Sequence, residues 1–300
     1  MMKQILLWAA LLLFVLPLAG RGGQARARSG DGTEERPVKI VSYNIRYGTA
    51  DDGPDRWERR RGAVIELLRG QRPDVIGLQE ALRFQIDEIR EAMPGMAEVG
   101  VGRDDGRAGG EHSQILFDAG RFVLAEGGTF WLSETPRTPG SRSWGSAFPR
   151  ICVWARLVDR ATGAGLYVYN THWDHVSQEA RERSAAAIAA HAAARGVGAD
   201  PVVILGDLNA GEENPAVAAL REAGYRDAFR VLHPEAAGGS FNAFRVGHEG
   251  GEKIDYVFVS PGLEVLSAEI LRDRTPEGRW PSDHFPVTAA VRPSGPDQAR

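Results

Sequence analysis

Hydrophobic and polar residues alternate along several short stretches of the chain, as they do in half-buried β-strands. VKIVSYN (38–44) shows this alternation, and PDVIGLQEA (73–81) reads as a strand that runs directly into the helix FQIDEIREAM (84–93). ICVWARLVD (151–159) and GLYVYNTHW (165–173) are two strands that the turn RATG joins into a predicted hairpin. Further strands are predicted in ILFD (115–118), FVLAEGGTFWL (122–132), PVVILGDLN (201–209), KIDYVFVS (253–260) and FPVTAAV (285–291).

Helical patterns occur singly between these groups of strands. RWERRRGAVIELLRG (56–70) carries apolar residues at helical spacing beside an Arg-rich face, which we interpret as solvated. Ser177 is the expected cap of an Ala-rich helix that ends before Gly196, and Asn214 followed by a proline opens a helix that Gly224 closes. Because strands outnumber helices and often follow one another in hairpins, the pattern predicts an α+β fold with more than one sheet.

The first residues predict export. An apolar run, ILLWAALLLFVLPLA (5–19), is short for a membrane span, and ARA (25–27) offers small residues at the two positions that a signal peptidase reads. We interpret residues 1–27 as a cleaved signal peptide that directs the protein to the periplasm or the extracellular space, with an uncleaved N-terminal membrane anchor as the alternative. The rest of the chain divides into a polar tether, one domain and a polar tail, at residues 28–37, 38–292 and 293–300.

Composition limits how the domain is stabilised and what it binds. A chain of 300 residues with 43% hydrophobic content can form one large domain with a core. Cys152 is the only cysteine, so no intramolecular disulfide can form even in an exported protein. Loss of residues 1–27 would leave 33 basic and 40 acidic residues, a net charge of −7. This charge argues against a broad basic surface that grips long nucleic acid, but it leaves a local basic groove open.

Polar side chains recur where the predicted apolar strands end or begin. They are Asn44, Glu80, Asn170, His172, Asp207, Asn209, Asp255, Asp283 and His284. Any one of them could be a turn residue or a helix cap, but the repetition at six strand ends predicts a shared site. Carboxylate and amide oxygens are the ligands that Mg²⁺, Mn²⁺ and Ca²⁺ prefer, and two histidines with acidic partners can move protons near neutral pH.

Several other catalytic motifs are missing from the sequence. It contains no HExxH, no Cys/His zinc spacing, no Gly-x-Ser-x-Gly and no phosphate-binding Gly-rich loop with a lysine. These absences exclude zinc proteases, serine hydrolases and P-loop enzymes.

Seven short motifs follow one another in a recognisable order: SYNIRYG, GLQE, GEHS, NTHWDH, GDLN, KIDYVFVS and SDHFPV. Together they resemble the endonuclease/exonuclease/phosphatase superfamily, the group typified by deoxyribonuclease I and the abasic-site endonucleases, over residues 38–292. FWLSETP and PRICVWARL resemble a bacterial branch of secreted metal-dependent hydrolases in that superfamily. The resemblance implies a four-layer αββα sandwich of two packed mixed or antiparallel β-sheets flanked by helices, with the site at one end of the sheets.

The resemblance also implies which residues bind the metal and the substrate. Asn44, Glu80 and Asp283 match metal-site positions. Arg150 matches an arginine that contacts phosphate, and Asn209 matches a residue that positions a phosphate oxygen.

The remaining matches concern proton transfer. His172 matches a catalytic histidine that Glu111 orients, and His284 matches a histidine partnered by Asp255. Asp207 matches the acid that orients or deprotonates the attacking water. Which histidine protonates the leaving group stays open at this point.

The predicted function is therefore that of a divalent-metal-dependent phosphoesterase, with Mg²⁺ as the expected cofactor and Mn²⁺ or Ca²⁺ as alternatives. The substrate stays open between nucleic acid, a phospholipid headgroup or inositol phosphate, and a small phosphorylated metabolite. The alternative from another class is a catalytically silent binding module of the same fold, whose signature would be a missing ligand or histidine, and none is missing. We expect a monomer without an obligate protein partner.

Some loop residues near the motifs are candidates for weaker substrate contacts. Trp144, Trp173 and Trp280 could stack on a base or a sugar. Arg46 and Arg142 are candidates for further phosphate contacts.

Overall fold

The computed structural model describes residues 36–198, 200–248 and 251–294, which belong to one compact unit that begins at Arg36. The predicted signal peptide, most of the predicted tether and the last six residues of the predicted tail lie outside the described residues. Within the described ranges, no helix combines the length and the apolar character that a membrane crossing needs.

Two six-stranded sheets form the centre of the molecule. The first has the strand order β11-β12-β1-β2-β4-β3, formed by β11 (Leu263–Ile270), β12 (Val287–Pro293), β1 (Val38–Asn44), β2 (Val75–Gln79), β4 (Ile115–Asp118) and β3 (Met96–Val99). The second has the order β5-β6-β7-β8-β10-β9, formed by β5 (Phe122–Trp131), β6 (Ile151–Asp159), β7 (Gly165–His172), β8 (Val202–Asp207), β10 (Asp255–Val259) and β9 (Arg226–Asp227). Both sheets are mixed, and the predicted hairpin is the antiparallel pair β6 and β7.

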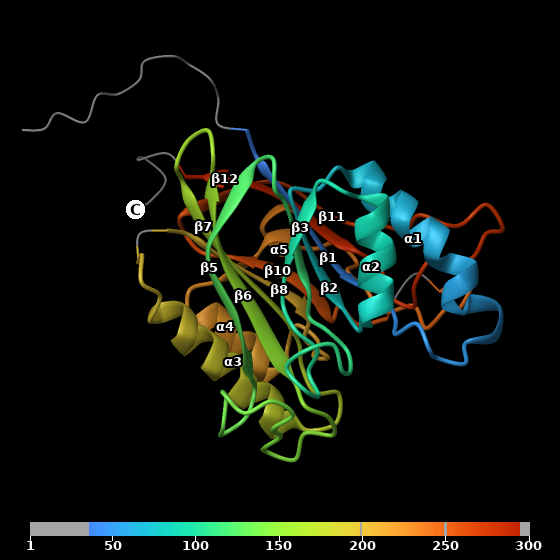
Figure 1. The fold of residues 1–300 in the computed structure, drawn as a ribbon, viewed down its shortest axis with the longest axis horizontal. Helices are drawn as coiled ribbons and strands as arrows, with labels where there is room; N and C mark the ends of the chain where they lie inside the picture. The colour runs from blue at the N-terminus through green and yellow to red at the C-terminus, as the bar shows by residue number, and fades with distance from the viewer. Residues whose placement is uncertain (1–35, 199, 249–250, 295–300) are drawn as a thin grey trace, which may run out of the picture. The chain divides into compact units, whose positions relative to one another are not determined.

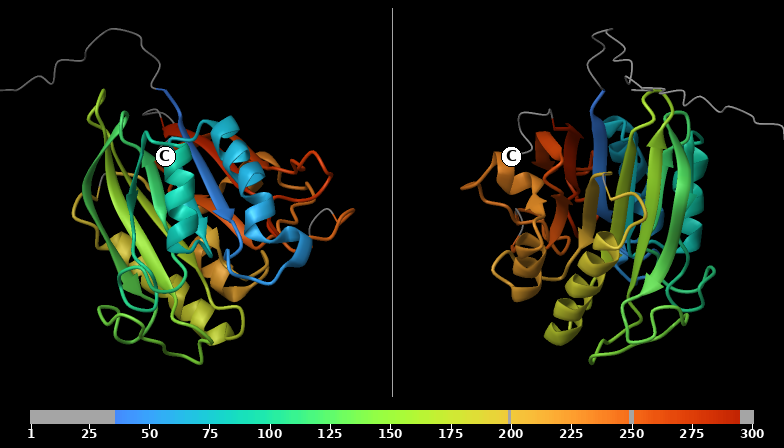
Figure 2. Two further views of the ribbon diagram at one scale, coloured as in Figure 1. Left: turned by 45° about the vertical axis from the view of Figure 1, so that its right-hand side comes forward. Right: turned by 90° about the vertical axis from the view of Figure 1, so that its left-hand side faces the viewer.

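Helices cover the outer faces of the two sheets. α1 (Trp57–Gln71) and α2 (Arg83–Ala92) lie on one side, while α3 (Gln178–Ala193) and α4 (Pro215–Glu222) lie on the other (Figures 1 and 2). Two shorter helices, η1 (Gly53–Asp55) and α5 (Ala228–Leu232), precede α1 and follow β9. One hydrophobic cluster fills the space between the sheets, and one more lies under each pair of outer helices. The predicted four-layer αββα sandwich is confirmed.

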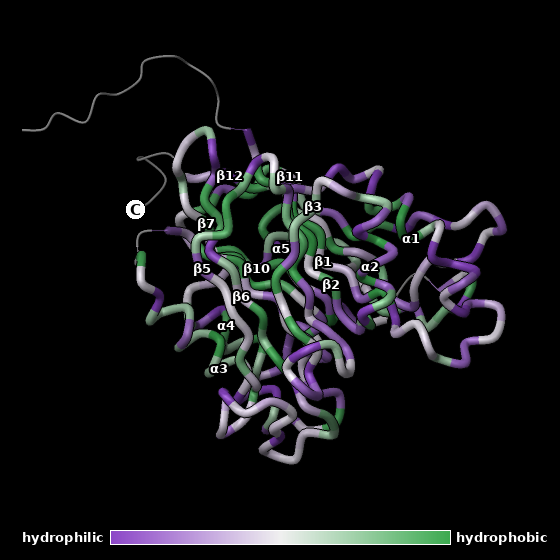
Figure 3. The backbone as a smooth tube through the Cα atoms, in the orientation of Figure 1, coloured by the Kyte–Doolittle hydropathy of each residue, from purple (hydrophilic) through white to green (hydrophobic). Residues whose placement is uncertain are grey.

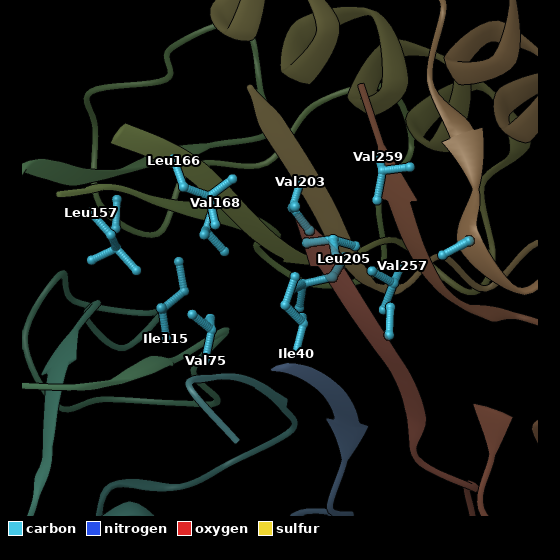
Figure 4. Packing of buried hydrophobic residues seen from close by; sticks show 14 of the residues in the cluster. Ile40, Val75, Ile115, Leu157, Leu166, Val168, Val203, Leu205, Val257 and Val259 are labelled. Atoms are coloured by element: carbon cyan, nitrogen blue, oxygen red, sulfur yellow. The ribbon is translucent and has the colours of Figure 1, made fainter. Parts of the chain in front are cut away.

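The core between the sheets consists mainly of β-branched and leucine side chains from facing strands (Figure 4). Ile40 and Val75 from the first sheet, with Leu205 and Val257 from the second, are at most 1% exposed. These strands appear as hydrophobic segments in the middle of the molecule, whereas the loops around them are mostly hydrophilic (Figure 3). Burial on both faces explains the mainly apolar sequences of the central strands β2, β8 and β10, whereas the outer strands β5 and β11 are partly exposed.

The strand directions bring the polar strand ends to one edge. β1 and β2 run parallel with α1 as their crossover, and β7 and β8 run parallel with α3 as theirs, so the carboxyl ends of each pair lie together. β12 is antiparallel to β1 and β10 is antiparallel to β8, so the residues that precede or open them lie at this edge too. Asp255, the first residue of β10, pairs in register with Asp207, the last residue of β8.

The two predicted helix caps are present, but one prediction about a helix face is wrong. The Ser177 hydroxyl accepts from the N–H of Ala180 to cap α3, and the Asn214 side chain caps α4. The prediction of a wholly solvated Arg-rich face on α1 is wrong for Arg60, which is 3% exposed. Its guanidinium is buried because it donates hydrogen bonds to backbone carbonyls next to the site, including that of Ile45.

Candidate active site

Asn44 joins the two sheets at the site. Its amide nitrogen lies 2.9 Å from Oδ2 of Asp207 in the other sheet and 3.1 Å from Oε1 of Glu80 in its own. The backbone N–H of Arg46 donates to Oδ1 of Asn44 at 3.0 Å and so fixes the amide. Arg46 and Glu80 each have φ of 57°, and Asn209 has φ of 46°, values that are uncommon for residues other than glycine. Backbone conformations of this kind concentrate at functional sites, where they turn a side chain away from the strand direction.

Acidic groups and one histidine form the cluster that could hold a cation. One ligand atom from each of Glu80, Asp207 and His284 lies within 4.8 Å of the others. Asp283 lies next to this group, because the Arg46 guanidinium lies 3.9 Å from its Oδ2 and 4.0 Å from Oε2 of Glu80. The three predicted metal residues are thus linked through Glu80, which also contacts Asn44, and the structure adds the Asp207 carboxylate to them.

Burial and neighbouring carboxylates raise the pKa values of two carboxyl groups, those of Asp207 and Asp283. Burial, and then the Asp255 carboxylate, raises the pKa of Asp207 to about 7. Burial raises the pKa of Asp283 to about 6; His284 opposes the shift and Glu80 adds to it. Crowded oxygen donors with raised pKa values are the chemistry that a hard divalent cation neutralises, so the residues present fit Mg²⁺ or Mn²⁺.

His284 is held by Asp255. Its Nδ1 lies 2.8 Å from Oδ2 of Asp255, which also accepts from the Ser240 hydroxyl at 2.7 Å. The other ring nitrogen, Nε2, faces Oδ2 of Asp207 at 3.7 Å. Burial alone would lower the pKa of His284, but the Asp255 and Asp207 carboxylates hold it well above its usual value. The two carboxylates therefore favour the protonated form of the imidazole.

His172 is the second histidine that faces Asp207, and its pKa is shifted in the opposite direction to that of His284. Its Nε2 lies 2.9 Å from Nδ2 of Asn209 and 3.4 Å from Oδ2 of Asp207. Burial, and then the nearby Arg150 and Arg103 guanidinium groups, lowers the pKa of His172 well below its usual value. Neutral His172 accepts the Asn209 N–H at Nε2. Two histidines whose environments move their pKa values apart are typical of an acid–base site.

Glu111 and Arg150 lie behind His172. Oε2 of Glu111 is 3.8 Å from Nδ1 of His172 and 2.6 Å from a guanidinium nitrogen of Arg103. Burial raises the pKa of Glu111, and Arg103 opposes this shift. Arg150 is 5% exposed and lies against His175, with 3.2 Å between its Nη2 and Nδ1 of the imidazole. All predicted catalytic, phosphate-binding and metal residues therefore lie at one end of the sandwich.

Not every predicted residue has the expected place. Asn170 does not join the site, because its amide donates to the carbonyls of Leu78 and Gln114 at 2.9 Å each and so ties the two sheets together. The stacking prediction is wrong for Trp173 and Trp280, which are 0% and 2% exposed and pack in the protein interior.

The other loop candidates for substrate contacts are Trp144 and Arg142. Trp144 is partly exposed, and its stacking role stays a prediction. Arg142 donates to the carbonyl of Ala147 at 2.8 Å. Sequence reasoning missed Arg60, Arg103 and Ser240. No periodic pattern marks Arg103 in the loop GRDDGRAGGE, whereas Arg60 shares helical spacing with the buried Trp57, Val64 and Leu68.

Comparison with known proteins shows the family and the fold. The model of the Endonuclease/Exonuclease/phosphatase family matches residues 41–284, a segment that contains every residue of the site. The chain belongs to this family. The fold is that of a solved member of the family.

Several solved family members are similar over most of the chain. A family protein from Bacteroides thetaiotaomicron is 33% identical, with a TM-score of 0.79, over 86% of this chain and 98% of that one. A mannosyl-6-phosphatase from the same organism is also 33% identical, with a TM-score of 0.80, over 85% of this chain and 99% of that one. The human nocturnin catalytic domain is 18% identical with a TM-score of 0.71, over 86% of this chain and 95% of that one, and shows the fold alone.

Curated relatives are longer and more distant. Drosophila melanogaster nocturnin is 24% identical over 83% of this chain and 45% of its own length. A CCR4-Not complex 3'-5'-exoribonuclease subunit from Emericella nidulans is 27% identical over 47% of this chain and 25% of its own length. The chain thus spans about half or less of the length of the curated relatives that it matches.

Proposed function

We propose that this protein is a divalent-metal-dependent phosphoesterase that cleaves its substrate by attack of an activated water. The observation that carries the proposal is the position of the Asp207 carboxylate between two histidines, 3.4 Å from His172 and 3.7 Å from His284. A phosphoester resists attack because it is anionic and its alkoxide leaves poorly. The site offers a base, cations and hydrogen-bond donors within one small volume.

A cation fits the group formed by Glu80, Asp207 and Asp283. When bound there, it would supply positive charge that offsets the charge developing on the phosphate and on the leaving oxygen. Asn44 contributes to the same group by its hydrogen bonds to Asp207 and Glu80, which keep the two carboxylates at a fixed separation.

The proton transfers are assigned to the groups by their positions. Asp207, which faces both histidines, orients the attacking water and takes its proton. Protonated His284, supported by Asp255, stabilises the negative charge on the phosphoryl oxygens. The Arg150 guanidinium holds the phosphate. The two N–H groups of the Asn209 amide are used by Nε2 of His172 and by the Trp173 carbonyl, so Asn209 orients the His172 ring rather than the phosphate.

Among the substrate classes, we propose a small phosphorylated metabolite. A groove of about 540 Å³ opens beside Asn209, and its lining includes Glu212, Glu213, Glu252, Arg181 and Lys253. Polar walls of this kind can form hydrogen bonds with the hydroxyls of a sugar. The mannosyl-6-phosphatase among the 33%-identical structures supports the same choice.

The proposal is tested by hydrolysis of a substrate panel with Mg²⁺, Mn²⁺, Ca²⁺ or EDTA. The panel holds mannose 6-phosphate, p-nitrophenyl phosphate, bis-p-nitrophenyl phosphate, plasmid DNA, RNA, sphingomyelin and inositol phosphates. His284→Gln should lower kcat by about 10²–10⁴-fold, as loss of a proton-transfer or charge-stabilising group does. His233→Ala is the matched control, because His233 bonds to the Ala268 carbonyl on β11, away from the reacting groups.

Turnover that requires a divalent ion and disappears in His284→Gln supports the phosphoesterase. Turnover that persists in EDTA, or that His284→Gln leaves unchanged, contradicts it. Preference for DNA, RNA or sphingomyelin over the monoesters contradicts the substrate class and leaves the reaction intact.

A further inference from the structure

A small cavity lies next to His172. Arg103 and Arg150, two of the residues that line it, have guanidinium nitrogens without hydrogen-bond partners among the described residues. The volume of the cavity is about 10 Å³, room for a single water-sized atom, and Arg103, Glu111 and Arg150 form part of its wall.

Arg150 faces this cavity with donors that lack acceptors. Neither its Nε nor its Nη1 has a hydrogen-bond partner among the described residues, and both are buried. The nearest carboxylate, that of Asp174, is 3.7 Å from Nε, beyond hydrogen-bond distance. A buried guanidinium with unpaired N–H groups is costly in free energy unless a ligand completes it.

Arg103 approaches the same cavity from the loop that precedes Glu111. One of its terminal nitrogens donates to Glu111 at 2.6 Å, while its buried Nε has no hydrogen-bond partner among the described groups and lies 3.9 Å from the Asp104 carboxylate. Its backbone is fixed, because its N–H donates to the Glu111 carbonyl and its own carbonyl accepts from the Trp131 indole. The guanidinium therefore has little freedom to move away.

Phe148 covers both arginines. Its ring centroid lies 5.0 Å from the Arg103 guanidinium carbon and 6.0 Å from that of Arg150. The ring keeps water from one side of the pair and so strengthens any charge–charge interaction there.

We propose that Arg103 and Arg150 together bind the terminal phosphate of a phosphomonoester, and that the cavity between them takes one phosphoryl oxygen. This inference rests on the proposed function and narrows it to monoesters. A monoester carries close to two negative charges on three free oxygens near neutral pH. Two of these oxygens can therefore face the arginine pair, one on each guanidinium.

A diester binds less strongly to this arrangement. It carries one charge shared by two free oxygens, so two guanidinium groups attract it less strongly than they attract a dianion. Selectivity for the monoester thus follows from charge.

A purely positioning role is the competing explanation for Arg103, since it also holds Glu111, which faces His172. The two explanations make opposite predictions for Glu111→Gln. If Arg103 acts only through Glu111, this variant should lose as much phosphate affinity as Arg103→Gln. If Arg103 binds phosphate, loss of the Glu111 charge should leave that affinity unchanged or raise it.

The test measures ligand binding as well as turnover. Isothermal titration with inorganic phosphate and with dimethyl phosphate compares the dianion with a diester in wild type, Arg103→Gln and Glu111→Gln, with Mg²⁺ present. Arg107→Gln, an exposed arginine in the same loop, is the matched control. Thermal melts confirm that each variant is folded.

We expect Arg103→Gln to weaken phosphate binding 10–100-fold, to change dimethyl phosphate binding less than threefold, and to raise KM for p-nitrophenyl phosphate far more than for bis-p-nitrophenyl phosphate. Equal losses for both ligands, or a matching loss in Glu111→Gln, overturn the inference. Phosphate binding that depends on Arg103 in a protein without esterase activity would support this inference and refute the proposed function.

Discussion

Replacement of Arg60 by methionine should destabilise the protein and weaken the metal cluster. Arg60 lies in α1, and its guanidinium donates to the carbonyls of Ile45 at 2.5 Å, Asp55 at 2.8 Å, Arg46 at 2.9 Å and Pro281 at 3.3 Å. Three of these carbonyls belong to the two segments that carry metal-cluster residues. One buried side chain therefore holds both segments in place.

The size of the effect follows from these bonds. Each hydrogen bond from a charged donor contributes about 1.5–3 kcal/mol, so the three shorter bonds together suggest roughly 5–9 kcal/mol. Burial lowers the pKa of Arg60, which shows that the guanidinium resists desolvation, and removal of the charge returns several kcal/mol. The net loss in free energy of unfolding should be about 2–4 kcal/mol, a fall in Tm of about 5–15 °C.

Urea unfolding would measure the loss of stability. A Mn²⁺ titration, monitored by electron paramagnetic resonance, would measure the change in metal affinity. Arg59→Met is the matched control, since Arg59 is the exposed neighbour in the same helix. We expect Arg60→Met to bind Mn²⁺ about tenfold more weakly and Arg59→Met to behave as wild type. A stability loss below about 1 kcal/mol, or equal losses in the two variants, would refute the reasoning.

Three further predictions concern the metal, the backbone and a helix cap. Mn²⁺ at a hundred times its dissociation constant should raise Tm by about 5–10 °C, EDTA should reverse the rise, and Glu80→Gln should abolish it. Gly206→Ala should cost more than about 2 kcal/mol in urea unfolding, because a Cβ there would lie 1.9 Å from the Thr171 carbonyl oxygen and φ is 143°; a soluble variant of wild-type stability would contradict this. Ser177→Ala should cost about 1 kcal/mol by the same measurement, through loss of the bond to the Ala180 N–H, and no change would show that the cap contributes nothing.

Much of the fold and the site could be predicted from residues whose environment is local. The caps at Ser177 and Asn214 depend on the next three residues, so the sequence alone reveals them. The strand-end pattern located Asp207 and Asp255 because polar groups rarely end so many apolar strands by chance. Their direct pairing depends on the antiparallel register of β8 and β10, which a single sequence does not display.

The failures concern residues whose burial depends on distant partners. Trp173 follows a site histidine directly, but the next position of an extended chain points to the other face, where α3 and α4 cover it. Arg59 and Arg60 point to different faces of one helix: Arg59 is exposed, whereas Arg60 lies on the buried face with Trp57 and Val64, where its polar side chain finds carbonyl partners from distant segments. Arg103 became recognisable only when its unpaired nitrogen and the cavity were visible together.

The site depends on the spacing of the two sheets, since its central hydrogen bond joins Asn44 of one to Asp207 of the other. Gly77 lies on β2 behind this contact, where a Cβ would come within 2.0 Å of Leu205 and 2.9 Å of Asn170. The missing side chain lets the sheets approach closely near the site, and the buried Asn170 amide locks that approach through bonds to the first sheet. The positions of the base and of the acidic cluster are therefore set by the core between the sheets rather than by the loops, which leaves the loops around Arg103 and Phe148 free to determine which phosphate ester is accepted.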